Sequence, residues 1–288
     1  MRKHYYLIST SHLEDRIWFQ DEEDYRVAMN LVAVAAFVCG VTVLDFILMS
    51  NHVHFIMQAS EEDARRFIDY FKLLYSKHLR NRYGFSKYLR GNTSDIKEIA
   101  VCEESLERAI AYVQMNCVAA NICAHPSAYP WGCGSVFFNR APSDGRKRLG
   151  DLSKRECIRL LHSNSSLPPD YEILPEGFIN PCSYVSVSFV EELFGTPRRF
   201  QFFLNNSSKA KNRLAGDAMP SFRDQVIMSG LPDLCASLFR KHSLSELSSE
   251  EKSEMLKQLR YRFSADIAQL SRVTGIPYAE ACNLVEAF

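Results

Sequence analysis

The sequence predicts an α+β protein in which an antiparallel sheet domain precedes a mainly α-helical domain. Short β-forming runs alternate with long helix-forming runs over residues 1–138, as in mixed domains. Residues 139–150 are polar and basic and contain glycine and proline, which is typical of a linker. Residues 151–288 are mostly helical in pattern. We therefore expect a first domain, a linker and a helical C-terminal domain with these bounds.

The first domain opens with a strand, a helix and a hairpin. Tyr5–Thr10 is a short aromatic and β-branched run, which indicates a strand. Asp21–Cys39 begins with acidic residues and ends before a glycine, as an α-helix does. Val41–Met49 is strongly β-forming, and the Ser50-Asn51 pair can make the turn into a second strand over His52–Met57.

A second helix, a further strand and a third helix follow. Glu61–Arg82 predicts a long helix that ends near a glycine, and Ile96–Val101 alternates as a strand does. Glu103–Ile122 carries acids in its first turn and apolar residues on most faces, so we expect a well-buried helix. The first six elements follow the split βαβ, or ferredoxin-like, order, in which helices cover one face of an antiparallel sheet.

The end of the C-terminal domain has the spacing of two short helices. In Ser264–Phe288 a helical run is followed by Thr274-Gly275 and a second helical run, which resembles a helix-turn-helix. The second run carries Glu280 and Glu286 and no lysine or arginine, which is poor for contact with phosphates. A plain helical hairpin therefore stays open as the alternative.

Composition places the chain among cytoplasmic proteins that do not enter a membrane. The 34 basic and 34 acidic residues cancel, and the chain contains no apolar run of about 18 residues, the length that a membrane span requires. We read no signal peptide in the N-terminal residues. The nine cysteines form no C-x-x-C pair, which favours a reducing compartment. Cys123 and His125 lie close together, but no second pair completes a zinc spacing.

Two windows of the sequence are basic and lack acidic residues. Basic clusters interleaved with aromatic residues suit the phosphates and splayed bases of a nucleic acid, and the alternative is a solvated helix face. The second window, 193–216, includes Arg198, Arg199, Lys209, Lys211 and Arg213. The first window, 70–94, contains the residues that we predict to bind DNA: Lys72, Lys77, Arg80, Arg82, Lys87 and Arg90.

Two histidines stand in the middle of the apolar stretch LMSNHVHFIMQ. On a strand, residues i and i+2 point to the same face, so His52 and His54 project together about 7 Å apart at a rise of about 3.3 Å per residue, while Val53 points the other way. Two imidazoles on one face can offer two nitrogens to a single metal ion. The alternative is a pair of hydrogen-bonded histidines on an exposed sheet face, and a metal site would need a third ligand.

The third expected helix offers both a third ligand and a nucleophile. Tyr112 and Asn116 are four residues apart and therefore share a helix face. A tyrosine hydroxyl can act as a covalent nucleophile, and an asparagine carbonyl can ligate a hard divalent cation. The alternative is a core tyrosine beside a surface asparagine. Tyr75 on the basic helix competes as nucleophile, but Leu79 rather than an amide or acid follows it at that distance.

These residues resemble the motifs of single-tyrosine HUH transposases, in particular the REP-associated tyrosine transposases. MSNHVHFIM is similar to the family strand M-x-N-H-V-H, and YVQMNCVAANI is similar to its helix Y-I-x-x-N-P-V-x-A. HPSAYPW is similar to the P-x-x-Y-x-W segment that follows. The resemblance covers about Tyr5–Trp131, in order and at the family spacing. Cys117 stands in place of the usual proline, and Gly132-Cys133 replaces the usual serines.

The resemblance implies a fold, a cofactor and a reaction. It implies a ferredoxin-like domain in which His52, His54 and Asn116 ligate Mg²⁺ or Mn²⁺ and Tyr112 is the nucleophile. The family's partners are single-stranded or hairpin DNA, cleaved and rejoined through a 5′-phosphotyrosine intermediate. Whether the Tyr112 helix serves its own chain or a second copy in a homodimer is left open by the sequence.

Two other functions stay open at this point. A domesticated relative would bind DNA or RNA hairpins without cleaving them, which leaves the intact His52, His54, Tyr112 and Asn116 unexplained. A helical regulator that acts through its C-terminal domain would make the HUH resemblance accidental.

Overall fold

The computed structural model describes residues 4–11, 17–100, 104–120, 122–139, 147–207, 224–263 and 265–286. The N-terminal elements are β1 (His4–Thr10), α1 (Glu22–Cys39), β2 (Thr42–Met49), β3 (His52–Ala59), α2 (Glu61–Tyr83), β4 (Ser94–Ile99), α3 (Ser105–Gln114) and α4 (Asn116–Ala119). Beyond them lie β5 (Lys147–Arg148), α5 (Lys154–Leu161), β6 (Glu172–Ile173), α6 (Val187–Phe194) and α7 (Pro197–Asn206). The C-terminal helices are α9 (Asp224–Phe239), α10 (Ser249–Phe263), α11 (Ile267–Thr274) and α12 (Tyr278–Glu286).

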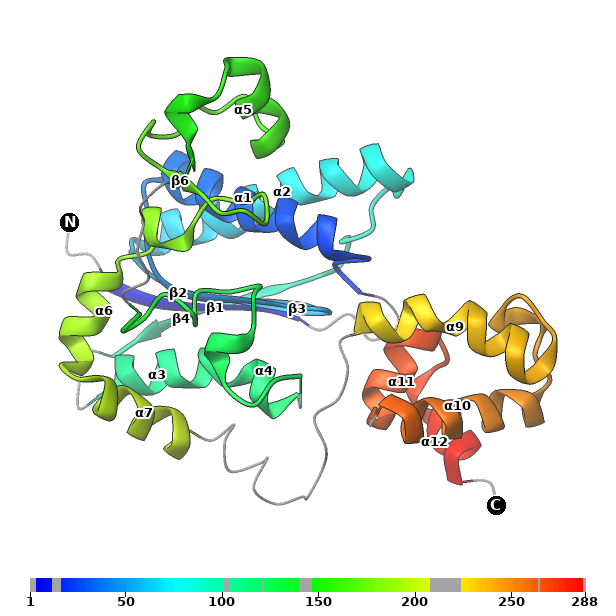
Figure 1. The fold of residues 1–288 in the computed structure, drawn as a ribbon. Coiled ribbons are helices and arrows are strands. Elements are labelled where there is room, and N and C mark those ends of the chain that lie inside the picture. Colours follow the sequence, from blue (N-terminus) through cyan, green and yellow to red (C-terminus); the bar gives the residue numbers. More distant parts are fainter. Residues whose placement is uncertain are drawn as a thin grey trace.

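The main sheet has four strands in the order β2-β3-β1-β4, and every neighbouring pair is antiparallel. This strand order, together with the βαββαβ order along the chain, is the ferredoxin-like arrangement that the sequence predicts. The α+β fold class is therefore confirmed, including the mainly helical C-terminal region. Figure 1 shows the sheet edge-on, with α1 and α2 on one side, α3, α4 and α7 on the other, and α6 beside one edge.

Strand β3 lies between β2 and β1, and its successive side chains point to alternate faces of the sheet. Phe55 packs toward α2, with its ring centroid 5.0 Å from that of Phe67 and 5.5 Å from that of Phe71. Its neighbour His54 therefore points to the opposite face, the side on which α3 lies (Figure 1). The sequence expectation of helices on one face holds for α1 and α2, whereas α3 covers the other.

The helix α1 is buried on two sides, which explains why its apolar residues surround most of its circumference. It begins at the N-cap Asp21, whose side chain accepts from the Asp24 N–H, and ends at Gly40 in the left-handed region at φ 66°. Its inner side packs on the sheet and α2, and residues 149–179 cover its outer side. Asn30 joins the layers, because its amide donates to the Leu160 carbonyl at 3.0 Å and accepts from the Ile179 N–H at 2.8 Å.

Residues on both sides of the predicted linker share one hydrophobic core. Residues of α6 and α7, including Val190, Phe194 and Leu204, belong to the same buried cluster as the sheet. The Ser186 N–H also donates to the Val43 carbonyl of β2 at 2.9 Å. The bounds 1–138, 139–150 and 151–288 stay a prediction, and residues 140–146 of that linker lie outside the described residues. Residues 147–207 nevertheless pack as part of the sheet domain.

The helices α9 to α12 bury a separate hydrophobic cluster, whose centre includes Met255, Leu256 and Leu270. α11 and α12 are the two helices expected in 264–288, and Gly275 caps the first of them at φ 72°. Their role as a DNA-binding helix-turn-helix stays a prediction. The amide of Gln225 on α9 donates to the Phe19 carbonyl at 2.8 Å, which ties this group of helices to the segment before α1.

Within the described part of the chain, none of the helices has both the length and the hydropathy that crossing a membrane would require.

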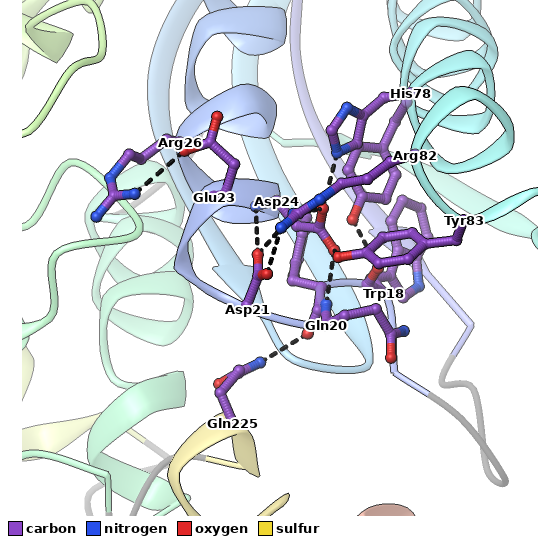
Figure 2. A network of polar contacts seen from close by, with 12 residues as sticks. Trp18, Gln20, Asp21, Glu23, Asp24, Arg26, His78, Arg82, Tyr83 and Gln225 are labelled. Carbon is purple, nitrogen blue, oxygen red and sulfur yellow. Dashed lines mark hydrogen bonds and ion pairs between the residues drawn. The ribbon is translucent and has the colours of Figure 1, made fainter. Parts of the chain in front are cut away.

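A buried carboxylate organises the contact between α1 and α2 (Figure 2). Asp24 is fully buried and accepts from His78 and from Arg82, each at 2.7 Å. It also accepts from the Tyr83 hydroxyl at 3.2 Å and from the Gln20 N–H at 2.8 Å. The carboxylate thus exchanges its hydration for four donors, which hold the start of α1 against the end of α2.

We expect Asp24→Ala to lower the free energy of unfolding by about 3–5 kcal/mol, because it leaves the Arg82 and His78 side chains without their buried partner. Urea denaturation measures the change. Glu23→Ala on the same helix is the matched control, since Glu23 forms an exposed ion pair with Arg26 at 3.1 Å and should cost at most about 1 kcal/mol. Equal small losses for the two variants would contradict a structural role for the Asp24 network.

Candidate functional site

The two histidines of β3 lie side by side on the sheet face that α3 covers. The ring centroids of His52 and His54 are 4.8 Å apart and the ring planes meet at 85°. Both residues are nearly buried, with 7% and 5% of their surface exposed. The period of the strand thus brings two imidazoles to one place, as the His-Val-His spacing predicts.

Each imidazole is oriented by a hydrogen bond at Nδ1. His52 Nδ1 lies 2.8 Å from the side-chain oxygen of Asn51, and because that oxygen only accepts, Nδ1 carries the proton. His54 Nδ1 lies 2.8 Å from the hydroxyl of Ser9, its partner across the strand pair with β1. Metal-binding histidines are held in this way, with one nitrogen bonded to a fixed group and the other presented to the ion.

The helix α3 places Tyr112 beside this histidine pair. The Tyr112 and His54 ring centroids are 6.1 Å apart and the rings meet edge to face at 80°. Tyr112 is half-buried, so its phenol is accessible in part. The α3 helix packs on the sheet of its own chain, against β2, β3 and β4. A single chain therefore brings the histidine pair and the tyrosine together, and whether a second copy contributes stays a prediction.

The single helix predicted over Glu103–Ile122 is wrong, because the helix breaks at Met115. The side-chain amide of Asn116 donates to the carbonyls of Tyr112 and Val113, both at 3.0 Å. It thereby takes two acceptors that backbone N–H groups of a continuing helix would use. The chain then makes the short α4, and residues 101–103 and 121 lie outside the described residues. Asn116 still follows Tyr112 by four residues, but as the first residue of α4, with its side-chain amide bonded to carbonyls of α3.

The side chains predicted as ligands supply some of the donor atoms that a divalent cation needs. The amide nitrogen of Asn116 is used by the two carbonyls, so its side-chain oxygen is the atom with ligand character. Two imidazole nitrogens and one amide oxygen are acceptable donors for a divalent ion, with further positions open to water or substrate. Among the residues that the structure describes, no group of three or more histidines, cysteines, aspartates or glutamates gathers as a metal site. A third ligand would therefore have to be of another kind, and Asn116 stays the predicted one.

A buried polar cluster seats α3 on the sheet, and the sequence analysis did not single it out. Asp45 of β2 is fully buried and accepts from the Gln114 amide at the end of α3 and from the Cys133 thiol at 3.0 Å. Burial raises the pKa of Asp45 to about 7, because no cation compensates the charged form. The signal in the sequence was a lone acid inside the apolar strand VTVLDFILM.

We expect the contribution of Asp45 to stability to fall as the pH rises from about 4 to about 7, since the folded state binds the Asp45 proton more tightly than the unfolded chain does. The contribution of this group falls by at most about 1.4 kcal/mol per pH unit. Asp45→Asn removes the titration, so the difference in unfolding free energy between the two proteins should change with pH in that window. Urea denaturation at about pH 5 and about pH 7 measures it. Parallel pH profiles for the two proteins would contradict the raised pKa.

The competing nucleophile Tyr75 is buried on the other side of the sheet. It is fully buried, and its hydroxyl donates to the Trp18 carbonyl at 2.6 Å. Its ring stacks on Trp18 and Phe71, at centroid distances of 6.1 and 6.3 Å. Burial raises the pKa of Tyr75 well above its ordinary value. A phosphate cannot reach this phenol without unfolding the core, so Tyr112 is the better candidate.

Two of the six basic residues predicted to bind DNA have structural partners instead. Lys72 donates to the Asn92 carbonyl and the Ser94 hydroxyl at 2.8 and 2.7 Å, and burial lowers its pKa. Arg82 pairs with Asp21 and with the buried Asp24 (Figure 2). A cation committed to such partners is a poor phosphate ligand, because the contact would first have to break.

The other four basic residues of that window are exposed: Lys77, Arg80, Lys87 and Arg90. The helix α2 lies on the face opposite the histidines, which the sequence did not reveal (Figure 1). The loop 84–93 leads into β4. In the register of the sheet, Asp95 of β4 lies opposite Ser9 of β1, and Ser9 lies opposite His54 of β3. Lys87 and Arg90 therefore lie toward the end of the sheet that carries the histidines. Contact with DNA stays a prediction for these residues.

The second basic window is only partly described, since Lys209, Lys211 and Arg213 fall in the undescribed residues 208–223. Arg199 of α7 pairs with Glu104 and Glu107 of α3, at 3.2 and 3.1 Å. His125 uses both ring nitrogens in hydrogen bonds, with Ser127 and with Gln201 of α7. α7 is thus fixed to α3 and to the loop after α4.

The protein is of the α+β class, with a histidine pair on one face of a ferredoxin-like sheet and Tyr112 of α3 beside that pair. No protein-family model matches the chain. No curated protein sequence matches it. Among solved structures it is similar to a REP-associated tyrosine transposase bound to a REP hairpin, with a TM-score of 0.38 and 10% identity. The match covers 60% of this chain and 94% of that one. The likeness is distant, and nothing about the chemistry of this chain follows from it.

Proposed function

We propose that the protein is a metal-dependent DNA strand transferase of the HUH type, which cleaves and rejoins single-stranded or hairpin DNA through Tyr112. The observation that carries the proposal is the edge-to-face contact between the Tyr112 and His54 rings, at 6.1 Å. A nucleophile with no metal nearby would have to attack a phosphodiester without charge neutralisation. A histidine pair with no nucleophile nearby would bind a metal without covalent chemistry.

The reaction needs one nucleophile and no nucleotide cofactor. The phenolic oxygen of Tyr112 bonds to the phosphorus as the bond from phosphorus to the 3′ oxygen breaks, and the phenolic proton ends on the 3′ hydroxyl. The product is a 5′-phosphotyrosine, which keeps the energy of the phosphodiester. The 3′ hydroxyl of another strand can attack this bond, which restores the tyrosine and joins the strands.

In this proposal His52, His54 and Asn116 hold Mg²⁺ or Mn²⁺. When bound, the ion would supply Lewis-acid polarisation of a non-bridging phosphate oxygen. The chain's own part is orientation. Asn51 and Ser9 fix the two imidazoles through Nδ1, and the Asn116 amide ties its own carbonyl oxygen to the helix end that bears Tyr112. Preorganised groups of this kind lose little free energy of reorganisation when substrate arrives.

We expect a covalent protein–DNA adduct when the full-length protein is incubated with single-stranded DNA from its own genomic flank and Mn²⁺. With the label at the 3′ end, the adduct is a labelled band that resists SDS. With the label at the 5′ end, the expected product is a shortened free strand, because the tyrosine keeps the 5′ phosphate of the downstream piece. EDTA, His54→Ala and Tyr112→Phe should each remove the adduct.

Tyr70→Phe is the matched control, since Tyr70 is a half-buried tyrosine on the basic helix α2. It should leave the amount of adduct unchanged. An adduct that survives Tyr112→Phe would refute the assignment of the nucleophile. Measurable binding to hairpin DNA with no adduct from any flank would instead favour a non-catalytic hairpin-binding protein.

A further inference from the structure

A groove between α3 and α7 opens directly beside Tyr112. It has a volume of about 510 Å³, and its walls include Tyr112 and Arg108 of α3 and Phe202 and Asn206 of α7. The helix α7 lies beyond the segment that carries the HUH motifs, so the chain has added a wall to the candidate site. The wall is fixed, because Phe203 and Leu204 of α7 are buried in the hydrophobic core of the sheet domain.

The α7 wall carries an exposed aromatic ring over a buried one. Phe202 is 60% exposed, whereas Phe203 is 6% exposed and packs in the core. The two rings meet at 84° with centroids 5.9 Å apart, and the Arg199 guanidinium lies 5.0 Å from the centre of the Phe203 ring. An exposed phenylalanine on a rigid helix at the edge of a groove is a surface on which a flat ring can stack.

The α3 wall carries a cation that is loosely held. Arg108 pairs with Glu104 one turn earlier at 3.3 Å, and its side chain is 71% exposed. Exposed pairs of this kind contribute little stability, so the guanidinium can turn to a phosphate at small cost. A cation and a phenol on the α3 wall, together with an aromatic ring on the α7 wall, match the three parts of an unpaired nucleotide: phosphate, reactive linkage and base.

We propose that this groove binds an unpaired nucleotide next to the phosphodiester that Tyr112 attacks, with its base stacked on Phe202 and its phosphate near Arg108. This inference rests on the proposed function and adds the place where the nucleotide next to the cleavage point is held, since stacking on Phe202 requires a base that is not paired. The C-terminal extension then has a direct part in DNA binding through α7.

The test measures binding apart from cleavage. A fluorescein-labelled 20-nucleotide single strand from the genomic flank is titrated with the full-length protein in EDTA, and anisotropy gives the affinity. We expect Phe202→Ala to weaken binding about 5- to 150-fold, since stacking on an aromatic side chain contributes about 1–3 kcal/mol per base. Phe202→Trp should restore it. Arg108→Gln should weaken binding and lower the salt dependence by about one phosphate contact.

Phe37→Ala is the matched control, because Phe37 is a phenylalanine on α1 with 48% exposure, on the far side of the sheet (Figure 1). It should bind as the unmodified protein does. Equal affinities for Phe202→Ala, Phe37→Ala and the unmodified protein would overturn the proposal, provided that all three melt at the same temperature.

Photo-crosslinking separates this inference from the proposed function. Strands that carry 5-iododeoxyuridine at successive positions should crosslink to the tryptic peptide 200–209 at one position only. That crosslink, together with the loss of binding in Phe202→Ala, would support the groove even if no phosphotyrosine adduct forms. An adduct at Tyr112 with no crosslink in this peptide and no loss of binding would overturn the groove and leave the proposed function intact.

Discussion

The pleat of β3 is the constraint on which the candidate site depends. Because successive side chains of a strand alternate, the order His-Val-His-Phe gives two imidazoles to one face and Val53 and Phe55 to the core on the other. The strand lies between β2 and β1, so its register is held from both sides. Ser9 on β1 is set opposite His54 by that register and orients its ring. A shift by one residue would bury the imidazoles among phenylalanines and expose the core.

The candidate site also depends on the position of α3 over this face of the sheet, and polar contacts hold the helix there. Gln114 at the end of α3 reaches down to the buried Asp45, and Cys133 closes the same carboxylate from the following loop. Asn116 then ends the helix by taking the carbonyls of Tyr112 and Val113. The helix is therefore anchored at its C-terminal end, just after Tyr112, by Gln114 and Asn116. Asp45 and Asn116 are poor residues for a strand and a helix interior, and their contacts explain their presence.

Part of the chain beyond residue 139 packs against the sheet domain, and part of it lies at the candidate site. Residues 149–179 cover α1, which would otherwise expose an apolar surface, and Asn30 bonds to Leu160 and Ile179 of that layer. α6 and α7 extend the core below the sheet and bring Phe202 to the edge of the candidate site. The helices α9 to α12 have a core of their own and contact the sheet domain through Gln225. The extension is thus in part a component of the sheet domain.

The sequence alone determined the order of the elements, the ferredoxin-like class, and the shared face of His52 and His54, because these depend on local periods of two and 3.6 residues. It also pointed to Tyr112 through its spacing to Asn116, although the helix that links them is broken. Only the tertiary structure decided which residues meet across long separations. In the folded protein Tyr75 is buried, and Asp45 lies beneath α3 and binds Gln114. Lys72 and Arg82 contact other residues of the same chain. Local patterns do not encode such contacts, since the partner of a buried polar group is chosen by packing rather than by spacing.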